Sequence, residues 1–72
     1  MIKMMKSNDV SNWDDLPVGT RAFSELGGWW DKVSHKSPAW SWWYSGVRCD
    51  MPTSDAVWLE VPIGLTQNKN GV

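Results

Sequence analysis

The sequence contains one cysteine, Cys49, and one histidine, His35, in 72 residues. A single cysteine excludes an intrachain disulfide, and these two residues are too few for a four-ligand zinc site. A chain of this length forms one domain of marginal stability, and small domains usually add cross-links, dense aromatic packing or oligomerisation. Because cross-links are excluded, aromatic packing and self-association remain. A free thiol also fits the reducing cytoplasm, where we expect this protein.

Charge of one sign and long apolar runs are also scarce. The formal net charge is −1, from 7 basic and 8 acidic residues, so the chain lacks the basic stripe that binds nucleic acids. No segment approaches the roughly 18 apolar residues of a transmembrane helix. Residues 1–6 include lysines, but no apolar run follows them, which argues against a signal peptide. We therefore expect neither a membrane nor a nucleic acid as the main partner.

Motifs for catalysis and for metal binding are missing. His35 lies in a polar stretch, and the chain has no Gly-x-Ser-x-Gly segment to supply a nucleophile. Gly27-Gly28 lacks the Lys-Ser/Thr pair of a phosphate-binding loop, and Asp14-Asp15 lacks the ligand spacing of a calcium site. We predict that the protein is not an enzyme and needs no cofactor or metal.

Cys49 has neighbours of opposite charge. A guanidinium next to a thiol favours the thiolate, so Arg48 would lower the thiol pKa, and Asp50 would oppose that shift. We interpret Cys49 as a half-buried structural residue.

Tryptophan, in contrast, is abundant: there are seven, and four of them form the adjacent pairs Trp29-Trp30 and Trp42-Trp43. Neighbouring residues of a strand point to opposite faces, so each pair places indoles on both sides of a sheet. A small core cannot hold all of them, and tryptophan is enriched at the anchors of protein interfaces. We predict that one member of each pair is exposed. The candidate interface residues are Trp29, Trp43 and Tyr44, and the candidate core residues are Trp30, Trp40, Trp42 and Trp58.

Short apolar runs separated by turn residues predict a mainly β fold. Four strands are expected over residues 20–23, 29–33, 39–44 and 56–61, with a Gly-Gly hairpin turn between the first two. Residues 12–17 predict one short helical turn capped by Asn12. Residues 47–51 predict either a short extension of the preceding strand or an edge strand. We expect an antiparallel meander curled into a small open barrel of SH3-like size. We predict a flexible arm over residues 1–12, a β domain over residues 13–64 and a flexible tail over residues 65–72. Alternatively, the apolar residues of the arm pack against a neighbouring molecule.

Several of these signals occur in a characteristic order. Trp-Asp-Asp-Leu-Pro-x-Gly-Thr spans residues 13–20, and Gly-Gly-x-Trp-x-Lys-Val spans residues 27–33. A Trp-rich strand over residues 40–44 and a Val-Trp-Leu-Glu-Val strand over residues 57–61 follow. Over residues 13–61 the chain thus resembles small uncharacterised β proteins encoded by bacteriophages and prophages. The resemblance implies an accessory factor that acts on a host protein in the bacterial cytoplasm, and it identifies no functional residues.

These observations favour a protein that acts through protein contacts, either by binding or inhibiting a host or phage protein or by self-association as a homo-oligomer. The alternative is a small β barrel that binds single-stranded nucleic acid by stacking bases on tryptophan. The flanking cations for that alternative are Arg21, Lys32, Lys36 and Arg48. A third reading is sugar binding by stacked indoles, against which the missing secretion signal counts.

Overall fold

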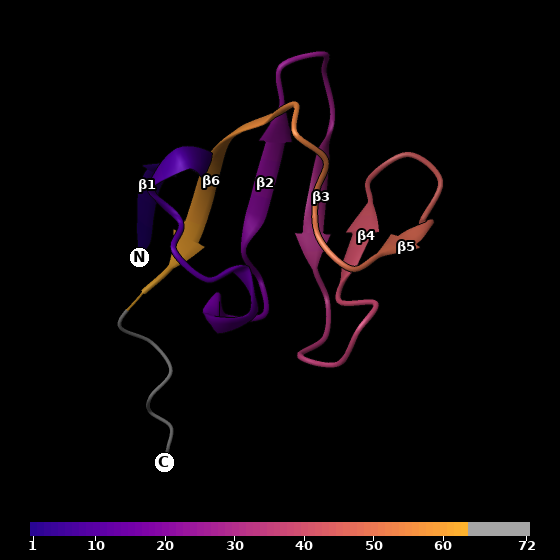
Figure 1. Ribbon diagram of the computed structural model, residues 1–72, viewed down its shortest axis with the longest axis horizontal. Helices are drawn as coiled ribbons and strands as arrows, with labels where there is room; N and C mark the ends of the chain where they lie inside the picture. The colour runs from indigo at the N-terminus through magenta and orange to yellow at the C-terminus, as the bar shows by residue number, and fades with distance from the viewer. Residues whose placement is uncertain (64–72) are drawn as a thin grey trace.

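The computed structural model describes residues 1–63, so the predicted tail over residues 65–72 lies outside the described part of the chain. Six strands form one antiparallel sheet in the order β1-β6-β2-β3-β4-β5 (Figure 1). The strands are β1 (Ile2–Lys6), β2 (Arg21–Ser24), β3 (Trp29–Lys32), β4 (Trp40–Trp42), β5 (Arg48–Cys49) and β6 (Ala56–Pro62). Two 3-10 turns, η1 (Ser7–Asp9) and η2 (Trp13–Asp15), connect β1 to β2.

The prediction of a mainly β, antiparallel fold is confirmed. The four expected strands correspond to β2, β3, β4 and β6, and residues 47–51 contain the short β5. The strand expected over residues 39–44 is shorter than predicted: β4 ends at Trp42, and Trp43 and Tyr44 lie in the turn that follows. The sheet is not closed into a barrel: β1 and β5 are its two ends (Figure 1). The C-terminal β6 crosses back to lie between β1 and β2, so only β2 to β5 form a meander.

The N-terminal segment differs from the flexible arm expected over residues 1–12. All five residues of β1 pair with β6, from Ile2 opposite Pro62 to Lys6 opposite Trp58. Met5, opposite Leu59, packs against the core. The edge of the seven-residue strand β6 supplies hydrogen-bonding groups for this segment. Residues 2–6 therefore form a strand because they pair with residues more than fifty positions away in the sequence.

Two local turn signals are confirmed. Asn12 precedes η2, and its Oδ1 accepts a hydrogen bond from the backbone N–H of Asp14 at 3.0 Å, as an N-cap does. The hairpin between β2 and β3 contains Gly27 and Gly28 at φ +106° and +83°, values that side chains with a Cβ rarely adopt. The turn therefore needs the glycine pair that the sequence provides.

The core lies on one face of the sheet, called here the core face. Trp40 and Leu59 are 1% and 0% exposed, and Trp13 of η2 packs edge-on against Trp40 with ring centroids 5.7 Å apart. The segments that contain η2 and residues 50–55 lie over this face (Figure 1). The buried apolar residues are Leu16, Ala22, Trp30, Ala39, Trp40, Ala56, Leu59 and Val61.

A buried lysine fastens η2 to the core face. Lys32 of β3 is 2% exposed, and its ammonium group donates to the backbone carbonyl oxygens of Trp13, Asp14 and Leu16 at 3.2, 2.9 and 2.6 Å. Carbonyl partners satisfy a charge that would otherwise be costly to bury. Lys32 thus holds the connection between the N-terminal turns and β2.

Candidate functional site

The face opposite the core face, called here the outer face, carries a row of aromatic side chains. Trp58 of β6 lies opposite Phe23 of β2, and Phe23 lies opposite Trp29 of β3. Trp43, directly after β4, donates its backbone N–H to the carbonyl oxygen of Trp29 at 2.9 Å and so continues the register. Directly opposed residues share a face of the sheet. These four residues are called the aromatic row, and with strands about 4.8 Å apart they span roughly 14 Å.

Three of the four rings in the aromatic row contact one another, and Trp58 lies opposite Phe23 in the register. Trp29 and Trp43 are stacked, with centroids 4.9 Å apart and planes 28° apart, and Phe23 lies 6.3 Å from Trp29. Tyr44 extends the row with an edge-on contact to Trp43 at 5.5 Å. Trp43, Trp58 and Tyr44 are 46%, 44% and 79% exposed. The row is therefore an apolar stripe on one face of the sheet, and its two ends are exposed.

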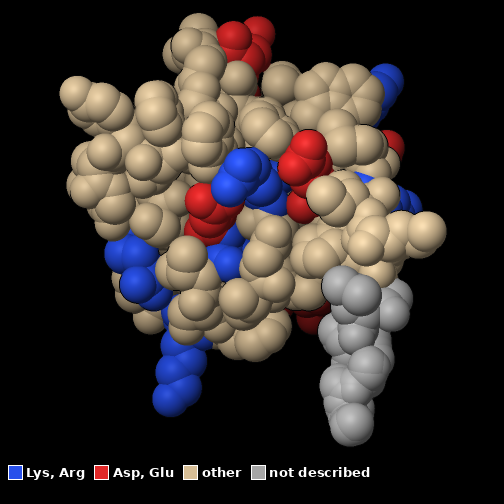
Figure 2. Space-filling model, turned by 180° about the vertical axis from the view of Figure 1, so that it is seen from behind, with Lys and Arg blue, Asp and Glu red and all other residues tan. Residues whose placement is uncertain are grey.

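A charged row runs beside the aromatic row. Arg21 lies between Asp31 of β3 and Glu60 of β6 in the register, and its Nε donates to Asp31 Oδ1 at 2.8 Å. The guanidinium carbon lies 4.7 Å from the centroid of the Trp29 ring, and Trp29 Nε1 donates to Asp31 Oδ2 at 3.3 Å. Figure 2 shows basic groups between acidic groups near the middle of this face, with a broad uncharged area above them. Arg21 and Asp31 together fix the orientation of the Trp29 indole.

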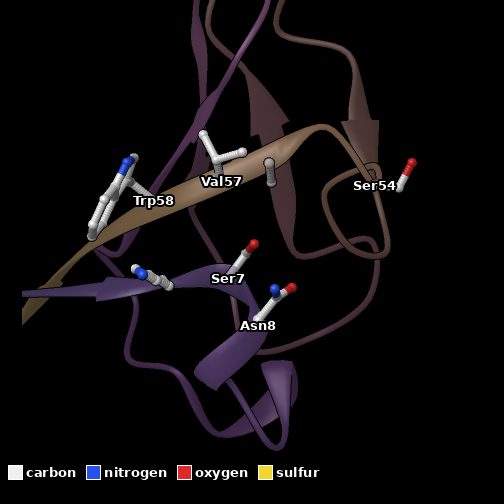
Figure 3. A pocket seen from close by; sticks show the side chains of 7 residues that line it. Ser7, Asn8, Ser54, Val57 and Trp58 are labelled. Carbon is white, nitrogen blue, oxygen red and sulfur yellow. The ribbon is translucent and has the colours of Figure 1, made fainter.

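A shallow hollow of about 280 Å³ adjoins the Trp58 end of the aromatic row. The side chains of Ser7 and Asn8 point toward the start of β6, where Val57 and Trp58 lie (Figure 3). The Lys6 ammonium group lies 5.9 Å from the centroid of the Trp58 ring. The hollow is lined by Lys6, Ser7, Asn8, Ser54, Ala56, Val57 and Trp58. It offers polar groups and one cation next to an exposed indole.

The structure brings the three candidate interface residues together. Trp29 and Trp43 belong to the aromatic row, and Tyr44 lies beside Trp43. Trp43 and Tyr44 are exposed as predicted, whereas Trp29 is half-buried, because the Trp43 indole stacks on it. Two members of the row, Phe23 and Trp58, were not among the predicted interface residues. The prediction of Trp58 as a core residue is wrong: Trp58 is 44% exposed, because it alternates along β6 with the buried Leu59 and so points to the outer face.

The four cations expected for nucleic-acid binding do not gather. Lys32 is buried on the core face, which corrects its assignment as a flanking cation. Arg48 donates from Nε and Nη2 to the carbonyl oxygen of Pro38 at 3.0 and 2.6 Å, and Lys36 lies exposed in the loop before β4. Of the four, Arg21 alone contacts the aromatic row, and it is paired with Asp31.

Three further findings concern metal ligands, the thiol of Cys49 and helices that could cross a membrane. Among residues 1–63, no group of three or more His, Cys, Asp or Glu residues is placed to hold a metal ion. Burial, and to a smaller extent the charge of Asp50, raise the pKa of the Cys49 thiol above its ordinary value. No helix within residues 1–63 has the length and apolar character needed to cross a membrane.

Comparisons of the chain with protein-family models, curated proteins and solved structures gave no match.

Proposed function

We propose that this chain is a non-catalytic binding module that holds a partner protein on the outer face of its sheet. The observation that carries the proposal is the aromatic row, which crosses β6, β2 and β3, ends directly after β4, and is exposed at both ends. Contiguous apolar patches on small proteins mark interaction sites, and Trp, Tyr and Arg dominate the energetic centres of protein interfaces. The row would form the apolar centre of such an interface and the charged row part of its polar rim.

The balance of charge favours a protein over a nucleic acid. Proteins that stack single-stranded bases place their aromatic residues in a positively charged groove. Here Arg21 is paired with Asp31 and lies opposite Glu60, and Lys32 is buried beneath the opposite face. The outer face therefore presents mixed charges, which suit the rim of a protein interface.

The context of the proposal is a bacterial host. The resemblance of residues 13–61 to small phage and prophage proteins supports a host or phage protein as the partner and the host cytoplasm as the compartment. Inhibition or redirection of that partner is part of the same proposal.

Binding to immobilised protein tests the proposal. Wild type, Trp43→Ala and Trp58→Ala are exposed to bacterial lysate, with Met51→Ala as the matched control. Met51 is also 48% exposed, but it lies beside η2, on the side of the core face. We expect one captured protein to be lost with both tryptophan variants and kept with Met51→Ala, while circular dichroism shows that all variants are folded. Equal capture by all four proteins contradicts the proposal.

A titration with single-stranded oligonucleotides at low salt tests the alternative. Stacking on Trp29 or Trp43 would quench or shift the tryptophan emission. We expect no change for oligo-dT or oligo-rU. A saturable change that is lost in Trp43→Ala would replace the protein partner by a nucleic acid.

A further inference from the structure

The outer edge of β1 is the longer free edge of the sheet. In the described part of the chain no strand pairs with it, and at the other end of the sheet β5 has two residues against five in β1 (Figure 1). Ile2 and Met4 of β1 are 60% and 54% exposed. An exposed edge of this kind is a template for pairing with a further strand.

The backbone groups that face outward can be assigned. Ile63 donates its N–H to the carbonyl oxygen of Met1 at 3.0 Å, so these two residues form a hydrogen-bonded pair. Such pairs alternate along an antiparallel ladder. Pro62 has no N–H, which agrees with the next pair, Ile2 and Pro62, being of the other kind. The residues whose N–H and C=O groups point away from β6 are therefore Ile2, Met4 and Lys6.

We propose that β1 pairs with β1 of a second copy of this chain, antiparallel and centred on Met4. A twofold axis through Met4 places every outward-facing residue opposite another one: Met4 opposite Met4, and Ile2 opposite Lys6. The residues between them then oppose each other as Lys3 and Met5. Like charges directly opposite each other on paired strands are destabilising. In this register no lysine lies opposite another lysine. The edge is thus self-complementary in both hydrogen bonding and charge.

This pairing produces a dimer and does not continue to larger assemblies. An interface around a twofold axis uses the same surface on both subunits and closes. After it forms, the remaining edges are the two-residue β5 strands. Opposed residues share a face, so the two outer faces become one surface with two aromatic rows. A five-residue edge covers less area than the roughly 1,200 Å² of a stable complex, so the dimer is weak and depends on concentration.

Single cysteines in a Cys49→Ser background test the register. In Met4→Cys the two thiols belong to a hydrogen-bonded pair with Cα atoms about 5.5 Å apart, which suits a disulfide. Ile2→Cys is the control, because Ile2 lies on the same face of β1 as Met4 and is similarly exposed. In the dimer its two cysteines would be four positions apart, roughly 14 Å along the strand. We expect oxidation to cross-link Met4→Cys and to leave Ile2→Cys monomeric. Equal cross-linking of the two variants overturns the proposal.

Sedimentation tests the association without a cross-link. Met4→Pro removes an N–H that points to the second copy and leaves the ladder to β6 complete. We expect the mean mass of the wild type to rise with concentration and that of Met4→Pro to stay at the monomer, with both folded by circular dichroism. A wild type that remains monomeric at millimolar concentration would refute the pairing, and it would leave the proposed binding of a partner on the outer face untouched.

Discussion

The indole of Trp43 fills the space where a side chain on Gly28 would begin. A Cβ atom built on Gly28 would lie 1.8 Å from Nε1 and 2.4 Å from Cδ1 of Trp43. The same indole stacks on Trp29, the residue that follows Gly28. The glycine of the hairpin turn is therefore also a requirement of the aromatic row.

Gly28→Ala should destabilise the protein more than an ordinary turn substitution. The added methyl group has to displace the Trp43 indole or shift the backbone, and overpacking of this kind costs about 1–3 kcal/mol. Alanine at φ +83° adds strain of about 1–2 kcal/mol. Urea unfolding followed by circular dichroism measures the sum.

Gly27→Ala is the matched control, because Gly27 also has a positive φ, +106°, but no atom beyond its two chain neighbours lies within 4 Å of its Cβ position. We expect only the strain there. Removing the indole in Gly28→Ala/Trp43→Ala should abolish the excess cost, as a double-mutant cycle would show. Additive effects of the two substitutions would mean that the indole does not occupy this space in solution.

Lys32→Met should also be destabilising, although it replaces a buried charge by an apolar side chain. The ammonium group donates to three backbone carbonyl oxygens around η2, and its loss leaves one buried and two part-buried acceptors without this donor. We expect a loss of about 2–3 kcal/mol in the free energy of unfolding. Lys36→Met, at an exposed loop position, is the control and should change it little. If Lys32→Met were as stable as the wild type, water would be satisfying these carbonyl groups.

The sequence predicts the strands whose signals are local. Turn residues such as Gly27 and Pro17 bound the apolar runs, the Gly-Gly turn locates β3, and the alternation of residues 39–44 locates β4. It does not predict β1, because Ile2–Lys6 has no alternation of its own and becomes a strand by pairing with β6. The position of β6 between β1 and β2 is equally a long-range property.

The sequence predicts only the part of the aromatic row that depends on local alternation. The alternation rule places the members of each tryptophan pair on opposite faces: Trp30 is buried and Trp43 is exposed, while their pair-mates Trp29 and Trp42 are half-buried. Composition cannot show that Trp58 joins the same row, since this depends on the register of β6 against β2. It also cannot show that a lysine of β3 is buried by carbonyl groups of a distant turn.

Stability should fall in acid partly through Asp55. Its carboxylate accepts hydrogen bonds from the hydroxyl groups of Thr53 and Ser24, and these bonds lower its pKa below the ordinary value. A carboxyl with a lower pKa in the folded state adds stability above the pKa of the unfolded chain, about 3.9. That contribution is lost as the pH falls through the lower folded value.

Unfolding in urea at pH 7 and pH 3 measures this contribution. Asp55→Asn should be less stable than the wild type at pH 7, and the difference should narrow at pH 3. Asp9→Asn, an exposed position in η1, is the control. A difference between wild type and Asp55→Asn that is the same at both pH values would contradict the role of the ionised carboxylate.

Cys49 should react slowly with alkylating reagents at neutral pH. Burial raises the pKa of its thiol, Asp50 raises it further, and a hydrogen bond from the backbone of Met51 lowers it in part. A raised pKa reduces the fraction of thiolate, which is the reacting form. The midpoint of a profile of iodoacetamide reaction rate against pH should therefore lie above that of a free thiol.

Two neighbouring variants separate the causes of this slow reaction. Asp50→Asn removes the smaller cause and should lower the midpoint, while burial keeps it above the ordinary value. Arg48 precedes the thiol in sequence, but its guanidinium group donates to the carbonyl oxygen of Pro38. Arg48→Gln should accordingly leave the rate profile nearly unchanged. A marked slowing in Arg48→Gln would mean that the arginine activates the thiol in solution, and the structural reading of Cys49 would then be wrong.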